Sequence, residues 1–127
     1  MMLKFKAWDK DKKVMSIIDE IDFNSGYILI STGYKSFDEV KVLQYTGLKD
    51  MNGVEIYEGD IVKVNVLEGI GPNARIVLKN GMFGVEDDMH GYGYDRGLYS
   101  LNLIINRHEV EVKGNIFESS HLLEEIE

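Results

Sequence analysis

The fold of this chain is decided by residues 43–64, which read LQYTGLKDMNGVEIYEGDIVKV. An apolar run, a turn, a short apolar run, a second turn and an alternating run follow one another. Asn52 and Gly53 are typical of a type I′ hairpin turn, which needs two residues that tolerate positive φ. Gly59 is free to adopt the left-handed conformation of a second turn. The stretch therefore predicts short β-strands that are connected by tight turns.

The run after the second turn has a period of two residues. Val62, Val64 and Val66 share one face, while Lys63 and Asn65 take the other. This alternation predicts a half-buried strand. Short strands joined by glycine-bearing turns are typical of small β-barrels. We therefore expect an all-β protein in which the valines line a closed interior.

Three segments of the chain carry a family resemblance. They are residues 43–62 around the central turns, KFKAWD at 4–9, and GNIFE at 114–118 followed by Leu122 and Leu123. Together they resemble the YopX family, which consists of small proteins of phages and prophages, mainly in Gram-positive bacteria. The chain departs from the family at 119–121, where SSH replaces Asn-Pro-Glu.

The resemblance implies an SH3-like small barrel for the main part of the chain. It implies no reaction, because the family has no established activity. We predict two parts: an N-terminal β-hairpin unit at 1–38 and an acidic SH3-like β-barrel domain at 39–127. A unit of about forty residues has little core of its own. It must pack on the barrel or on a second copy of the chain, so a homo-oligomer formed through this unit stays open.

Outside the central stretch, strands and loops follow from composition and turn signals. Residues 98–105 fit both a helical face and strand alternation, and we favour a short helix or an irregular turn. Ser119 or Ser120 is expected to cap a short helical turn near the C-terminus, through Ile126. The expected strands are 3–8, 14–18, 21–23, 27–32, 40–45, 54–57, 61–67, 74–79, 82–86 and 109–116. The expected loops are 33–39, 68–73 and 87–97.

Composition excludes several kinds of protein. The 127 residues are 44% hydrophobic and 28% charged, which is ordinary for a globular protein. Zero cysteines exclude disulfides, thiolate metal sites and a cysteine nucleophile. No apolar run approaches the roughly 18 residues of a membrane span, and no signal peptide is recognisable. We expect a protein of the bacterial cytoplasm, with no membrane partner.

The net charge of −8 is unevenly distributed. Residues 1–50 contain eight Lys and eight Asp or Glu, whereas residues 51–127 contain six Lys or Arg and fourteen Asp or Glu. Nucleic-acid binding requires basic side chains that neutralise phosphates, so this balance argues against it. The acidic half serves solubility, or it presents an acidic surface to a basic partner.

No motif predicts catalysis or a cofactor. Residues 69–74 match the dinucleotide fingerprint in spacing, but Pro72 and the strand-like residues after it contradict the required helix. Glu86, Asp87, Asp88 and His90 offer cation ligands without the spacing of an EF-hand, and we expect them to face water.

The three histidines also lack a partner at a catalytic spacing. His90, His108 and His121 do not form a His-Glu-x-x-His pair, and no Gly-x-Ser-x-Gly elbow is present. We expect no catalytic residue, no metal, no cofactor and no enzymatic activity.

Aromatic residues are the candidates for partner contact. Tyr92, Tyr94 and Arg96 lie in the loop GYGYDRG, where Tyr offers contact area at low entropic cost; alternatively, one Tyr folds back as a lid. Trp8 is a further candidate, because exposed aromatics of SH3-like domains line peptide grooves. The alternative for Trp8, as for Tyr45 and Tyr57, is packing in the core. Asp50 and Asp60 are predicted to be turn residues.

These observations favour a non-enzymatic protein-binding or assembly module of phage or prophage type, whose protein partner is unknown. An alternative is an acidic antagonist that mimics nucleic acid on a basic host protein. A third hypothesis is direct nucleic-acid binding through the N-terminal lysines, which are Lys4, Lys6, Lys10, Lys12 and Lys13.

Overall fold

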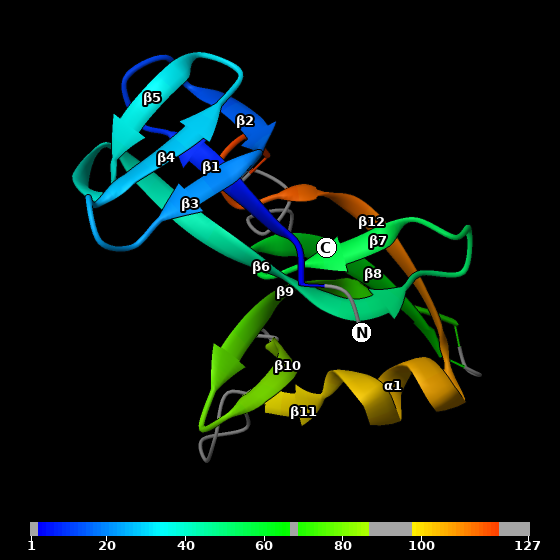
Figure 1. Cartoon of the computed structure of the whole chain (residues 1–127). Helices are drawn as coiled ribbons and strands as arrows, with labels where there is room; N and C mark the ends of the chain where they lie inside the picture. Colours follow the sequence, from blue (N-terminus) through cyan, green and yellow to red (C-terminus); the bar gives the residue numbers. More distant parts are fainter. Residues whose placement is uncertain (1–2, 67–68, 87–97, 120–127) are drawn as a thin grey trace. The chain divides into compact units, whose positions relative to one another are not determined.

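The computed structural model describes residues 3–66, 69–86 and 98–119 (Figure 1). Most of these residues are in β-strands, and one short α-helix is present, which confirms the predicted all-β class. The chain divides into two compact units, Met1–Gly47 and Leu48–Glu127. The division into domains at 1–38 and 39–127 and the SH3-like barrel stay predictions.

The first unit consists of two antiparallel sheets. One has the strand order β2-β1-β6, and the other has the order β3-β4-β5. Ala7, Ile28, Ile30 and Val40 form the buried core, to which both sheets contribute. The elements are β1 Phe5–Asp9, β2 Val14–Ile17, β3 Glu20–Asp22, β4 Tyr27–Ile30, β5 Gly33–Ser36, the 3₁₀-helix Phe37–Glu39 and β6 Val40–Lys49.

The expected loop at 33–39 is wrong, because this segment contains β5 and the 3₁₀-helix. Gly33 has φ of 114°, which turns the chain back so that β5 pairs with β4. The Glu39 carboxylate then accepts the Ser36 amide at 2.8 Å and closes the 3₁₀ turn. From the sequence alone, residues 36–39 are predicted to be a loop, because the pairing of β5 with β4 cannot be recognised in it.

The second unit is organised by an antiparallel sheet with the order β11-β10-β9-β8-β12. Val62 and Val64 lie in its core with Ile56, Ile76 and Leu101, so the predicted inward face of this strand is confirmed for these two valines. The side chain of Val66 lies outside the described part. The elements are β7 Glu55–Tyr57, β8 Asp60–Val66, β9 Gly69–Lys79, β10 Met82–Glu86, β11 Leu98–Ser100, α1 Leu101–Arg107 and β12 Glu109–Asn115.

Two local expectations in this unit are wrong. Gly53 has positive φ but Asn52 does not, so their turn is not type I′; positive φ at two successive residues occurs at Asn80 and Gly81. The expected loop at 68–73 is also wrong, because β9 begins at Gly69. The β8–β9 register shifts in this region, and such an irregularity admits Pro72 in a strand.

Residues 98–105 combine both patterns seen in their sequence. β11 comes first, and α1 begins directly after Ser100, whose hydroxyl accepts the Leu103 amide at 3.4 Å. Leu101 is fully buried and anchors this helix in the core of the second unit. The expected helical turn through Ile126 lies outside the described residues.

Candidate functional site

The buried aspartates of both units stabilise turns. In the first unit, Asp9 accepts the amides of Asp11 and Lys12, both at 3.0 Å, and the Thr32 hydroxyl at 2.7 Å. Lys35 Nζ lies 3.6 Å from the same carboxylate. The Lys12 amide and the Thr32 hydroxyl are the main causes that lower the pKa of Asp9 to about 2. Asp9 is therefore an ionised clamp that connects β1 to the second sheet of its unit.

Asp50 has a similar role in the second unit. Its Oδ1 accepts the amides of Asn52 and Val54, at 2.8 and 2.9 Å, and its Oδ2 accepts the Val112 amide at 2.9 Å. Asp60 accepts the Tyr57 amide at 2.8 Å. Both aspartates accept backbone hydrogen bonds beside a turn, as the sequence predicts.

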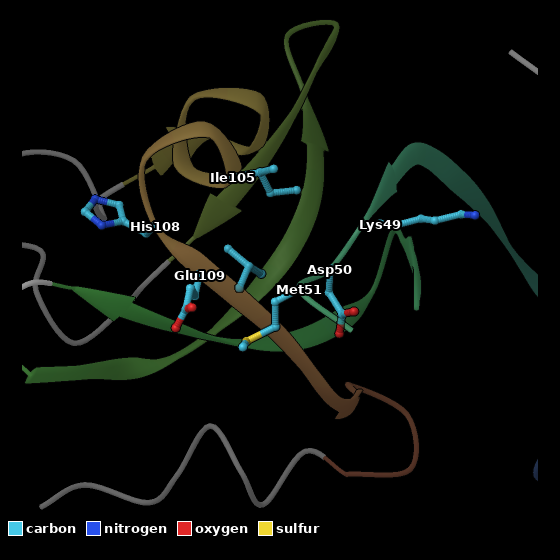
Figure 2. A pocket seen from close by; sticks show the side chains of 7 residues that line it. Lys49, Asp50, Met51, Ile105, His108 and Glu109 are labelled. Carbon is cyan, nitrogen blue, oxygen red and sulfur yellow. The ribbon is translucent and has the colours of Figure 1, made fainter. Parts of the chain in front are cut away.

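A cavity of about 220 Å³ lies beside Asp50 in the second unit. Figure 2 shows His108 and Asp50 on opposite sides of it, with Met51 and Glu109 between them. The Asp50 carboxylate is already held by three amides. The ionisable groups around this cavity therefore do not converge on one point. The lining residues are Lys49, Asp50, Met51, Ile105, His108, Glu109 and Val110.

Three aromatic residues of the family segments lie in the interior. Trp8 is 9% exposed, and Tyr45 and Tyr57 are also buried. Packing is thus the observed role of all three rings, and the role of Trp8 as a partner contact stays a prediction. The other candidates for partner contact, Tyr92, Tyr94 and Arg96, lie outside the described residues.

The carboxylates at the end of β10 are only partly within the described residues. The expectation that Glu86 faces water is wrong, because Glu86 is buried and accepts hydrogen bonds from Lys79 Nζ and, at 2.8 Å, from Arg75 Nε. The hydrogen bond from Lys79 is the main cause that lowers the pKa of Glu86, and Arg75 adds to it. Asp87, Asp88 and His90 lie outside the described residues. Within 3–66, 69–86 and 98–119, no three His, Asp or Glu side chains gather to hold a metal ion.

The structure reveals a surface that was not predicted, the outer face of the sheet β3-β4-β5. Ile28 and Ile30 of β4 point into the core, so Tyr27 points to the opposite face. On this face Asp22 is opposite Tyr27, and Leu29 is opposite Tyr34. Tyr27 is 52% exposed and Tyr34 is 66% exposed. Large rings of β4 and β5 are thus presented to solvent on this face.

A cavity of about 300 Å³ lies on this outer face. We call it the aromatic–acidic hollow, and it is lined by Glu20, Asp22, Ser25, Tyr27 and Tyr34. Asp22 accepts the amides of Asn24 and Ser25 and the Ser25 hydroxyl, all at 3.0 Å. The hydrogen bonds from Ser25 are the main causes that lower the pKa of Asp22. One wall of the hollow is therefore an ionised carboxylate in a fixed orientation.

The first unit has two further features with apolar side chains, a stacked ring pair and a second cavity. The rings of Phe23 and Phe37 are exposed and stack with their centroids 6.1 Å apart. A second cavity, of about 270 Å³, shares Glu20 with the hollow. It is lined by Leu3, Lys4, Phe5, Ile17, Ile18, Asp19, Glu20 and Ile21.

The sequence contained one signal for this surface. Residues 27–32 form an expected strand, in which Tyr27 alternates with Ile28 and is therefore on the other face. The neighbouring position of Tyr34 depends on β5, which was expected to be a loop.

The structure thus defines a mostly antiparallel β protein with two compact units, one short helix and an exposed aromatic face. The family model for YopX protein matches residues 4–124, and the chain belongs to the YopX family. The family resemblance of the sequence is confirmed by this match.

Two crystal structures resemble the whole chain. Protein EF1440 from Enterococcus faecalis has a TM-score of 0.69 and 25% identity, over 97% of this chain and 99% of its own. Protein yopX from Bacillus subtilis has a TM-score of 0.63 and 16% identity, over 94% and 97%. No curated protein matches the sequence. None of the helices in the described ranges has the length and apolarity that crossing a membrane requires.

Proposed function

We propose that this chain is a non-enzymatic, protein-binding module of phage or prophage type that acts in the bacterial cytoplasm. The observation that carries the proposal is the outer face of β3-β4-β5, where Tyr27 and Tyr34 are more than half exposed around a cavity of about 300 Å³. Exposed Tyr is enriched at protein interfaces, because its ring combines a large apolar area with a polar end.

The surroundings of this face support a protein partner. A second cavity shares Glu20 with the hollow and adds apolar side chains, among them Leu3, Phe5 and Ile17. Exposed apolar side chains that gather on one surface mark interaction sites. The carboxylates of Glu20 and Asp22 favour a partner segment that carries basic as well as apolar side chains.

The proposal is tested by a matched pair of Tyr variants. Tyr34→Ser removes an exposed ring of the outer face, and Tyr99→Ser removes a ring of similar exposure, 51%, in the second unit. Tagged wild-type chain and both variants are incubated with a lysate of Bacillus subtilis, and retained proteins are quantified by mass spectrometry. Because a central aromatic contact contributes a large share of binding energy, we expect Tyr34→Ser to reduce retention of the partner by about tenfold.

Tyr99→Ser is expected to retain the partner like the wild type. Equal retention by all three chains would overturn the proposal, once circular dichroism shows that the variants are folded. Sedimentation velocity over a range of concentrations shows whether the partner is a second copy. In that case, the wild type associates and Tyr34→Ser does not.

The charge distribution favours a second candidate, an antagonist that mimics nucleic acid on a basic host protein. Residues 48–127 contain seven Lys or Arg and fifteen Asp or Glu, which accounts for the entire net charge of −8. This candidate predicts that retention falls steeply with salt and that duplex DNA competes with the chain. Retention that is lost in Tyr34→Ser and is insensitive to DNA contradicts the mimic and supports the module.

A further inference from the structure

We infer that the aromatic–acidic hollow binds the guanidinium group of an arginine side chain of the partner. The inference rests on the proposed function, because it specifies what the outer face of β3-β4-β5 recognises. Its basis is that two tyrosine rings and two carboxylates line one cavity of about 300 Å³.

The strand register brings the two rings to one side of the sheet. Tyr27 is opposite Ser36, and Leu29 is opposite Tyr34, so Tyr27 and Tyr34 are diagonal neighbours on β4 and β5. Such neighbours are within reach of one another when their side chains are aromatic. An aromatic face attracts a cation, and arginine provides this contact more often than lysine. The rings can thus hold a planar cation by stacking.

The carboxylates come from the third strand of the same sheet. Glu20 is opposite Leu29, and Asp22 is opposite Tyr27. Asp22 is oriented by the two amides and the hydroxyl that it accepts, while Glu20 is exposed at the junction of the two cavities. An oriented acceptor and an exposed acceptor beside two rings provide both charge and direction for a bound cation.

The chemistry of the lining favours guanidinium over other groups. A purely apolar side chain would desolvate the two carboxylates without compensation, which is unfavourable. Phosphate would be repelled by the same carboxylates. An ammonium group satisfies the charge, but the planar guanidinium fork also bonds carboxylates with two N–H groups and stacks on rings. The first unit already holds one cation over a ring, with Lys4 Nζ 5.7 Å from the centroid of Tyr45.

The test uses a small probe and the full-length chain. N-acetyl-arginine methylamide is titrated into ¹⁵N-labelled protein, and amide shifts are followed; the lysine derivative and the uncharged norleucine derivative are the comparison ligands. We expect saturable shifts at residues 20–36 with the arginine derivative, weaker binding of the lysine derivative, and no saturable shift with the norleucine derivative. Shifts that are equal for arginine and norleucine would overturn the inference.

Two pairs of variants make the test specific. Glu20→Gln and Tyr34→Leu are expected to weaken binding of the arginine derivative by about fivefold or more, because each removes one of the two attractions. The matched changes Glu109→Gln and Tyr99→Leu affect exposed residues of the second unit and are expected to leave the affinity unchanged. Equal affinities of all four variants would overturn the inference.

The inference and the proposed function can fail separately. If a protein partner is lost in Tyr34→Ser but is neither displaced by the arginine derivative nor weakened by Glu20→Gln, the arginine inference is overturned and the module survives. If partner retention is unaffected by Tyr34→Ser, the proposed function fails, and arginine recognition of a partner fails with it. Displacement of the partner by the arginine derivative, with no displacement by norleucine, supports both.

Discussion

The two units of this chain differ in how they use charge. The first unit contains seven Lys and seven Asp or Glu and exposes aromatic rings, whereas the second carries the net charge of −8. Each unit also contains a buried aspartate beside a turn. Asp9 is held by amides, a hydroxyl and the ammonium group of Lys35, while the hydrogen bonds to Asp50 come from three amides. An aspartate therefore holds a turn in each unit, with amides, a hydroxyl and an ammonium group as partners in the first unit and with amides in the second.

This difference suggests that the units respond differently to mutation and to pH. A carboxylate bonded only by amides is sensitive to removal of its acceptor oxygens. Asp9, whose pKa is lowered mainly by the hydrogen bonds from the Lys12 amide and the Thr32 hydroxyl, is in addition sensitive to loss of its negative charge. The largest effects, however, are expected from the apolar cores.

The largest expected effect is that of Leu101→Ala in the second unit. Leu101 is fully buried, so its truncation leaves a cavity and is expected to lower the free energy of unfolding by about 3 kcal/mol. Urea unfolding is followed by circular dichroism and by fluorescence of Trp8, the single tryptophan, which reports on the first unit. We expect the circular-dichroism transition to shift more than the fluorescence transition.

Leu103→Ala is the control for this substitution. Leu103 belongs to the same helix and is 54% exposed, so a change below about 0.5 kcal/mol is expected. Equal shifts of both probes in Leu101→Ala would show that the two units unfold together, which contradicts the separate responses proposed here.

The next effect is that of Asp50→Ala. Three buried or partly buried amides lose their acceptor, and we expect a loss of about 2–3 kcal/mol in the free energy of unfolding. Chemical denaturation measures this loss, with Glu109→Ala as an exposed control in the same unit. A loss as small as that of the control would mean that these amides find water as an equivalent partner.

Asp9→Asn tests the response of the first unit to pH. The pKa of Asp9 in the folded protein is about 2, below its usual value of 3.8, so the ionised form is favoured by folding. The resulting stability is complete above pH 3.8 and is lost as pH falls through about 2. We expect wild type to melt at a higher temperature than Asp9→Asn at pH 6, and the difference to shrink towards pH 2.

Asp11→Asn provides the reference, because Asp11 bonds to Asp9 through its backbone amide and its side chain is exposed. A difference between wild type and Asp9→Asn that stays constant from pH 6 to pH 2 would assign the effect to packing instead of charge.

The smallest effects are expected from two glycines, one in each unit. Gly26 and Gly53 have φ of 77° and 82°, and nothing lies within 4 Å of a Cβ added to either. Gly26→Ala and Gly53→Ala should each cost about 1 kcal/mol, because only the left-handed backbone opposes the new side chain. The two variants should show similar decreases in melting temperature. A clearly larger decrease for one of them would show that the backbone of its turn does not adapt to the new side chain.

The sequence was most informative where neighbouring residues decide the structure. Alternation and glycine-bearing turns predicted β2, β10 and β12 closely, together with the inward face of Val62 and Val64. Pairing between distant segments was not predictable in this way. Residues 33–36 become a strand because they align with β4, and Pro72 is accommodated because β8 and β9 shift their register.

The candidate site was missed for the same reason. Its carboxylates come from β3 and its two rings from β4 and β5, so the hollow exists only after three strands are aligned. Tyr92, Tyr94 and Arg96 are predicted from the composition of a single loop, GYGYDRG, and they lie outside the described residues.

The edge strand β12 matters for how this protein behaves at high concentration. β12 is an edge strand of its sheet. The Val110 carbonyl of this strand accepts a hydrogen bond from the Met51 amide, and the Val112 amide donates one to the Asp50 carboxylate. The unpaired N–H and C=O groups of an exposed edge strand are a template on which a strand of another molecule can be added. Asp50 and Met51 thus cover part of this edge with hydrogen bonds from within the same chain. This hinders the addition of a strand from another molecule to the sheet.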